Sequence, residues 1–139
     1  MDFNQFLEQE KERVLKLYTV NHKPGFSTKQ ELSDWYLSQI QKQNYNCYYC
    51  ETSIFDIRSL IEVNVLKARK IRYGFRGLVL EIDKKENSLG YQKENCVLAC
   101  YYCNNDKSYT MDSNLYKKYF GISRFNFFQA LINQMRKEK

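Results

Sequence analysis

Four cysteines in two short-spaced pairs constrain the fold of this 139-residue chain more than any other feature. The pairs are Cys47-Tyr-Tyr-Cys50 and Cys100-Tyr-Tyr-Cys103, with 49 residues between them. Each two-residue spacer lets both thiolates reach the same ion, and two such pairs complete the tetrahedral sphere of a structural Zn²⁺. A closed four-cysteine site leaves no coordination position for a substrate. We therefore expect any catalytic residues to lie beside the zinc site and not to bind the zinc. Two disulfides, or a redox-active thiol, are the alternative interpretations.

The composition favours a reduced, metal-binding protein over a disulfide-bonded one. Hydrophobic residues make up 43% of the chain, enough for one core, but no apolar run reaches the length of a membrane span. The first residues, Met1-Asp2-Phe3-Asn4, lack a signal pattern. We therefore expect a cytoplasmic protein without membrane contact, in which thiols stay reduced. Cys96 lies in the apolar run 95–100 and is interpreted as a small buried side chain.

Positive charge is concentrated in one segment. The formal net charge of +6 favours a polyanionic partner, although excess lysine also serves solubility. Cations alternate with aromatic residues between positions 67 and 76, a pattern that can neutralise phosphates while rings stack or pack. A solvated basic surface is the alternative. The candidate DNA contacts are Arg58, Lys67, Arg69, Lys70, Arg72 and Arg76.

The N-terminal third predicts a helical arm. Apolar residues recur at helical spacing over residues 2–19. Thr28 followed by Glu31 is a capping-box pattern, and it predicts a second helix that ends before Cys47. Residues 54–76 fit either a helix or a basic strand pair. The arm is expected to span residues 1–43.

The middle of the chain predicts two strands followed by a helix. Residues 77–83 and 95–100 are rich in β-branched and apolar residues, and the polar segment 84–94 between them predicts a loop. A helix is expected to begin at the second cysteine pair. This core, residues 44–110, would be held by the zinc site.

The C-terminal segment 111–139 predicts two more helices. The first would start at Asp112 or Ser113 and stop at Gly121. The second would place residues such as Phe125 and Phe128 on one apolar face. The sequence therefore predicts one α+β domain, 1–139, in which a small zinc-bound core is flanked by N- and C-terminal helices.

Polar residues follow both predicted strands in a recognisable order. The pattern E-I-D ends at Asp83, and after a glycine-containing loop comes E-N-x-V-L-A-C-x-x-C-N-x-x-K-S, which contains Asn95 and Asn104. This arrangement resembles the HNH endonucleases, whose core is called ββα-metal. The resemblance covers residues 44–110 and extends to restriction enzymes of the family.

The resemblance implies a second metal site. Asp83 and Asn104 would offer oxygen ligands to one Mg²⁺ or similar divalent cation that binds the scissile phosphate. Asn95 would tie the loop to the strands. Read without the resemblance, Asp83 is a strand-end acid and Asn104 a helix N-cap.

One position departs from the family. The usual general base is a histidine directly after the strand-end aspartate, and here that residue is Lys84. An unperturbed lysine is a poor base at neutral pH, so Lys84 would instead steady the phosphate. Tyr49 is the preferred candidate for activating water, followed by Tyr91 and His22, the single histidine of the chain. A packed aromatic residue is the ordinary alternative for each tyrosine.

The resemblance implies a site-specific type II restriction enzyme that hydrolyses phosphodiester bonds of double-stranded DNA. A homodimer is expected, since two-fold protein symmetry matches a palindromic site. The alternatives are a catalytically inactive zinc module that binds nucleic acid, and a nicking homing or structure-specific HNH nuclease.

Overall fold

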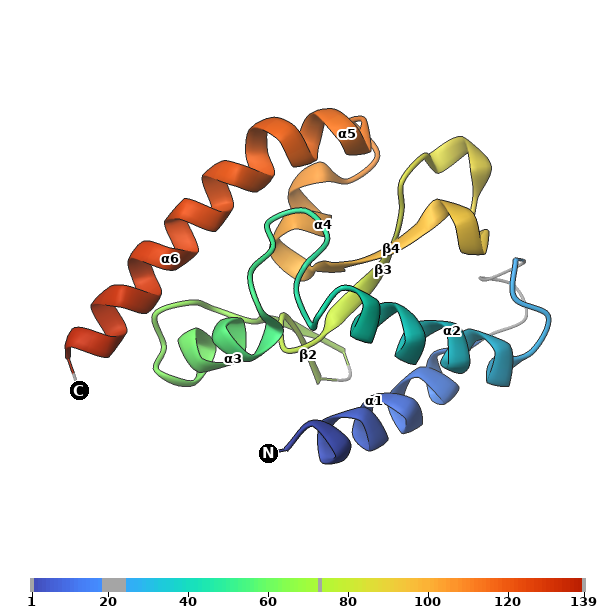
Figure 1. The fold of residues 1–139 in the computed structure, drawn as a ribbon, viewed down its shortest axis with the longest axis horizontal. Helices are drawn as coiled ribbons and strands as arrows, with labels where there is room; N and C mark the ends of the chain where they lie inside the picture. Colours follow the sequence, from blue (N-terminus) through green and yellow to red (C-terminus); the bar gives the residue numbers. More distant parts are fainter. Residues whose placement is uncertain (1, 19–24, 73, 139) are drawn as a thin grey trace.

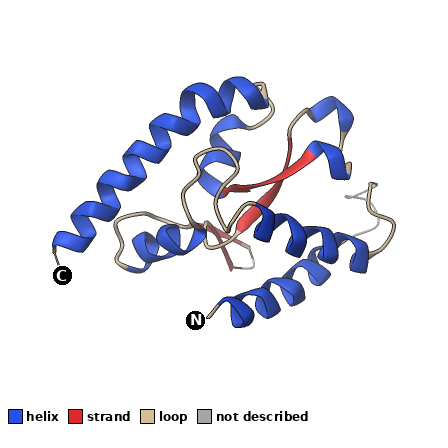
Figure 2. Ribbon diagram, viewed as in Figure 1, coloured by secondary structure: helices blue, strands red, loops and turns tan. Residues whose placement is uncertain are grey.

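Two antiparallel strands lie at the centre of the molecule, and helices surround them (Figure 1). The computed structural model describes residues 2–18, 25–72 and 74–138. In chain order the main elements are α1 (Phe3–Leu17), α2 (Lys29–Lys42), α3 (Ile54–Glu62), β1 (Arg69–Ile71), β2 (Gly74–Arg76), β3 (Leu80–Lys84), β4 (Cys96–Cys100), α4 (Tyr101–Lys107), α5 (Ser113–Leu115) and α6 (Ile122–Lys137). Figure 2 shows the mixture of helices and small sheets, which confirms the expected α+β class.

The central sheet consists of β3 and β4. Leu80 pairs with Cys100 and Asp83 pairs with Val97. All five residues of β4 are buried, whereas in β3 Leu80 and Asp83 are the fully buried ones. The first strand starts three residues later than predicted, because Gly77 has a φ of +130°, which ordinary side chains rarely adopt. The sheet therefore places a carboxylate at the buried end of a short strand.

The arm formed by α1 and α2 packs against the sheet. Phe6 and Val14 of α1 are buried against the same core as Leu32 and Ile40 of α2. The predicted cap is present: the Thr28 side chain accepts a hydrogen bond of 3.0 Å from the backbone N–H of Glu31. This N-terminal cap fixes where α2 begins.

A buried polar network joins the arm to β3. The Tyr36 hydroxyl lies 2.8 Å from Glu10 Oε1 and 2.8 Å from the carbonyl oxygen of Leu80. Arg13 pairs with Glu10 at 2.8 Å and donates to the Tyr36 hydroxyl at 2.9 Å. Because buried polar groups need partners, this network specifies how the arm docks.

Residues 54–76 combine the two structures that the sequence left open. The first part is helix α3, with Ile54, Ile57 and Leu60 buried. The second part is an antiparallel hairpin, β1 and β2, in which Lys70 pairs with Phe75. All three residues of β1 are exposed.

The prediction that Gly121 stops a helix is wrong. Helix α5 continues through a π-helical turn, Tyr116–Gly121, into α6, and Figure 1 shows one continuous rod. Gly121 has helical dihedral angles, φ −60° and ψ −44°. A Cβ atom at this position would lie 2.3 Å from the carbonyl oxygen of Tyr49. Glycine is therefore required here by close packing against the first cysteine pair.

Helix α6 buries Phe128 and Ile132, as the apolar pattern predicted, but Phe125 is exposed. Among the residues that the structure describes, no helix has the length and apolar character needed to cross a membrane.

Candidate active site

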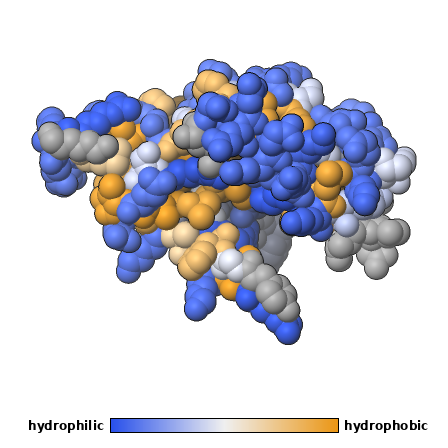
Figure 3. All heavy atoms as spheres, turned by 90° about the horizontal axis from the view of Figure 1, so that it is seen from below, coloured by the Kyte–Doolittle hydropathy of each residue, from blue (hydrophilic) through white to orange (hydrophobic). Residues whose placement is uncertain are grey.

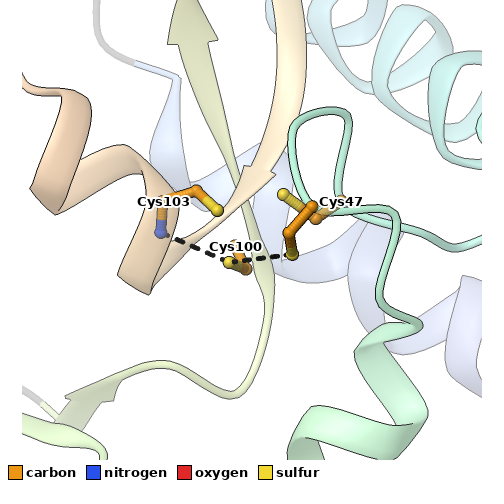
Figure 4. A group of neighbouring side chains, drawn as sticks. Cys47, Cys100 and Cys103 are labelled. Carbon is orange, nitrogen blue, oxygen red and sulfur yellow. Dashed lines mark hydrogen bonds between the residues drawn. The ribbon is translucent and has the colours of Figure 1, made fainter. Parts of the chain in front are cut away.

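The four paired cysteines meet at one point. Their Sγ atoms all lie within 4.8 Å of one another, and all four residues are buried. Figure 4 shows Cys47, Cys100 and Cys103 converging, with the backbone N–H of Cys103 directed at Cys100 Sγ. Four thiolates at about 2.3 Å from a tetrahedral zinc are roughly 3.8 Å apart, so the cluster fits that ion. The cysteines are free thiols, and Cys50 and Cys100 Sγ, 4.0 Å apart, are too distant for a disulfide.

Tyr49 extends from the first cysteine pair to the end of β3. Its ring is buried against Tyr116 of the π-helical turn, with centroids 5.3 Å apart. Its hydroxyl donates a 2.5 Å hydrogen bond to Asp83 Oδ2 and lies 3.0 Å from Ser113 Oγ. Because both flanking cysteines belong to the cluster, the position of this hydroxyl depends on the cluster.

Asp83 is also paired with a buried cation from α4. Lys107 Nζ lies 3.3 Å from Asp83 Oδ2, and the Lys107 side chain is completely buried. The same ammonium donates a 3.1 Å hydrogen bond to the carbonyl oxygen of Lys84. Both contacts to Asp83 use Oδ2, so Oδ1 is the atom through which this carboxylate can hold a further ligand.

Burial controls the protonation of this pair. It raises the pKa of Asp83 above its ordinary value, while the Tyr49 hydrogen bond and the Lys107 charge act in the opposite direction. Burial, together with the charge of Asp83, raises the pKa of Tyr49 well above that of a free tyrosine. Tyr49 is therefore a hydrogen-bond donor in this arrangement, and Asp83 is the acceptor.

Asn104 lies one helical turn before Lys107 and faces Glu81. Its Nδ2 donates a 2.9 Å hydrogen bond to Glu81 Oε1. Arg76 holds the same carboxylate with two hydrogen bonds, at 2.9 and 2.6 Å, and its guanidinium lies 4.7 Å from the ring centroid of Tyr101. Because Nδ2 must donate to the carboxylate, Oδ1 is the amide atom that remains to bind a cation.

The loop between β3 and β4 is organised by Asn95. Its side chain bonds the backbone of Glu86 twice, at 3.0 and 2.8 Å, and donates to the carbonyl oxygen of Gly90 at 2.8 Å. Lys84 Nζ lies 4.9 Å from the ring centroid of Tyr91. A cavity of about 460 Å³, lined in part by Asn95 and Ser113, opens beside this loop. His22, the third candidate base, lies outside the described residues.

Comparisons with known proteins test the fold. No family model matches the sequence, and no curated protein matches it. Among solved structures, one match is the rare-cutting HNH restriction endonuclease PacI, in a study of DNA perturbation by that enzyme. The match covers 94% of this chain and 82% of PacI, with a TM-score of 0.60 and 22% sequence identity. The chain has a PacI-like fold.

Within this PacI-like fold the predicted basic residues separate into two groups. Arg58 and Arg76 make internal contacts: Arg58 Nε donates to the carbonyl oxygen of Leu78 at 2.7 Å, and Arg76 holds Glu81. The exposed group lies on or beside the β1–β2 hairpin and consists of Lys67, Arg69, Lys70 and Arg72.

Exposed apolar side chains accompany this basic hairpin. Ile71 is 40% exposed and Phe75 is 56% exposed, so apolar and basic groups alternate on its surface. Figure 3 shows hydrophobic patches between hydrophilic ones on the side of the molecule seen from below. Such a surface can both neutralise phosphates and pack against bases or sugars.

Three residues of the candidate site were not predicted as site residues. Glu81 shares a face of β3 with Asp83, and Lys107 shares a face of α4 with Asn104, so strand and helix periodicity could have identified both. Ser113 reaches Tyr49 from a separate element, and no local sequence signal marks it.

Proposed function

We propose that this chain is a metal-dependent DNA endonuclease of the HNH type, and more specifically a site-specific type II restriction enzyme that cuts duplex DNA. The observation that carries the proposal is the placement of Asp83. It is the buried, penultimate residue of β3, accepts a hydrogen bond from a tyrosine of the first cysteine pair, and pairs with a buried lysine. A carboxylate held so rigidly at low exposure is typical of a functional site.

Two metals are implied. Cys47, Cys50, Cys100 and Cys103 would bind the structural Zn²⁺. Asp83 and Asn104 would hold Mg²⁺ or another divalent cation through their Oδ1 atoms, and carboxylate and amide oxygens suit that ion. When bound, the cation would stabilise negative charge on the scissile phosphate and on the leaving 3′ oxygen.

We propose that Tyr49 acts by orienting Asp83 and does not take a proton from water, because burial raises its pKa and its hydroxyl donates to that carboxylate. Its hydroxyl is held at a fixed place by Asp83 and Ser113. Lys84, half-buried as the last residue of β3, would bind the phosphate electrostatically, with Tyr91 supporting its ammonium group. Asn95 would act through the loop, which it holds by three hydrogen bonds.

The basic hairpin would supply most contacts to the DNA. Lys67, Arg69, Lys70 and Arg72 are exposed, and a two-stranded ribbon has the width that the major groove admits. Arg76 contacts Glu81 beside the site, so it would set the position of the hairpin relative to Asn104. We further propose that the enzyme acts as a homodimer on a palindromic sequence.

A second candidate function is a zinc module that binds nucleic acid without cutting it. The observation that favours it is Lys84, which occupies the place where the family has its histidine. Such a protein would keep the cysteine cluster and the basic hairpin. It would bind DNA in a salt-sensitive manner and would not cleave it with any divalent cation.

The test is digestion of a long, sequence-diverse DNA by the zinc-loaded protein with Mg²⁺ or Mn²⁺. Asp83→Ala is the negative control, and Asp83→Asn is a control of equal volume. Discrete fragments that disappear in both variants would support the restriction enzyme, and mapped fragment ends would give the recognition site. A random smear that is lost in the variants would keep the nuclease and refute the sequence specificity.

The same digestion separates the remaining alternatives. Tight, salt-sensitive binding without cleavage would establish the inactive module. Nicked circles that never become linear would identify a nicking enzyme and would argue against a homodimer that cuts both strands.

A further inference from the structure

Lys107 is an unusual residue, since a lysine is almost never fully buried unless its charge is paired. Its side chain is 0% exposed at the end of α4. Removing an ammonium group from water costs several kcal/mol, so its partners must compensate. The partners of Lys107 therefore indicate its role.

Every described polar contact of the Lys107 ammonium belongs to the candidate active site. Nζ lies 3.3 Å from Asp83 Oδ2 and 3.1 Å from the carbonyl oxygen of Lys84. It also lies 5.8 Å from the ring centroid of Tyr49. One cation therefore fixes the carboxylate, the backbone that follows it and the face of the tyrosine.

The charges around Asp83 disfavour a divalent cation in the free protein. Asp83 is neutralised by Lys107, and Glu81 is neutralised by Arg76. Lys84 adds another positive charge on the same strand. Two carboxylates thus face three cations, so the described site as it stands attracts a phosphate more strongly than a metal ion.

We propose that Lys107 is a positioning residue that neutralises Asp83 in the free protein and makes binding of the catalytic cation depend on a DNA phosphate. This inference rests on the proposed nuclease function. A phosphate beside Asp83 restores the negative charge that a divalent cation requires, so the cation and the DNA bind together. The protein without DNA holds its carboxylate in place and does not need the metal to do so.

The test measures Mn²⁺ binding by calorimetry in zinc-loaded protein, with and without a DNA duplex. In the wild type, the duplex should tighten Mn²⁺ binding. Lys107→Met keeps the apolar stem and removes the charge, so without DNA it should bind Mn²⁺ about ten-fold more tightly than the wild type. Lys107→Arg retains the charge and should keep the weak affinity. Asp83→Asn should abolish the response in each background.

Cleavage gives the second readout. Lys107→Met should cleave DNA more slowly at saturating Mn²⁺, because Asp83 and the Lys84 carbonyl lose their shared donor. A purely structural lysine would weaken metal binding and lower the melting temperature together; this outcome would overturn the proposal. So would unchanged Mn²⁺ affinity in a folded Lys107→Met variant.

Two further outcomes separate the role of Lys107 from the folding of the variant and from the nuclease function. If Lys107→Met does not fold, the wild type alone decides the matter, since equal Mn²⁺ affinity with and without the duplex contradicts the inference. If the wild type shows DNA-dependent Mn²⁺ binding and yet cuts no DNA, the nuclease function fails while the role of Lys107 stands.

Discussion

Substitution of Gly121 by alanine tests how the C-terminal helix contacts the cysteine cluster. The residue has ordinary helical dihedral angles, so alanine introduces no backbone strain. Its Cβ, however, would lie 2.3 Å from the carbonyl oxygen and 3.0 Å from the carbonyl carbon of Tyr49. Side-chain carbons essentially never approach another atom closer than 3.0 Å, so the helix or the first cysteine pair must move.

The magnitude follows from two opposing effects. Replacing glycine by alanine inside a helix stabilises it by up to about 1 kcal/mol. Inserting a methyl group into a packed contact costs about 1–3 kcal/mol, and the upper part of that range applies because the opposing atoms are backbone. We expect a net loss of about 1–2 kcal/mol and a fall of roughly 2–8 °C in the melting temperature.

The assay is thermal unfolding of the zinc-loaded protein followed by circular dichroism, with zinc content measured in parallel. Asn126→Ala is the matched control, because Asn126 is exposed on α6 and alanine there brings the helix preference without the clash. The control should melt slightly higher than the wild type, while Gly121→Ala should melt lower. If Gly121→Ala melted as high as the control, the proposed close packing would be refuted.

Three other predictions concern the metal, the tyrosine and the hairpin. Chelation of zinc should unfold or loosen the core, because the free energy of binding a structural zinc contributes to the free energy of folding. An unchanged melting temperature would contradict the assignment of the four cysteines to zinc. The control variant Cys96→Ala should keep full zinc content. Tyr49→Phe should lower the cleavage rate by about 10–100-fold, because Asp83 loses the donor that orients it, with zinc content and DNA affinity retained; full activity in this variant would exclude that role. Lys70→Gln should reduce the slope of DNA affinity against salt by about 1, whereas Lys137→Gln, at the far end of α6, should leave it unchanged.

Local patterns in the sequence predicted the elements around the site. The spacing of the cysteine pairs predicted their convergence, and Thr28 with Glu31 predicted the start of α2. The apolar runs predicted β3 and β4. The helix start and the strands depend on residues within a few positions of one another. The convergence of the cysteines follows because a four-cysteine zinc site is almost always tetrahedral.

The features that were missed depend on contacts between distant segments. Gly121 looks like a helix stop, and only the nearby carbonyl of Tyr49 shows that it is a packing glycine. Lys107 belongs to the predicted motif after the second cysteine pair, but its ion pair with Asp83 joins α4 to β3, and no local pattern shows that pair. The choice between helix and hairpin over residues 54–76 was open because both are present in succession.

The exposed hairpin begins and ends between the two cysteine pairs. A zinc ion shared by those pairs would make residues 47–103 a closed loop, and lengthening a closed loop adds little entropic cost. If the chain reads DNA as proposed, substitutions and insertions in the β1–β2 hairpin could alter its sequence preference during evolution while the strand bearing Asp83 stays in place. Each altered hairpin would have to keep the ion pair between Arg76 and Glu81, because this pair connects the hairpin to β3.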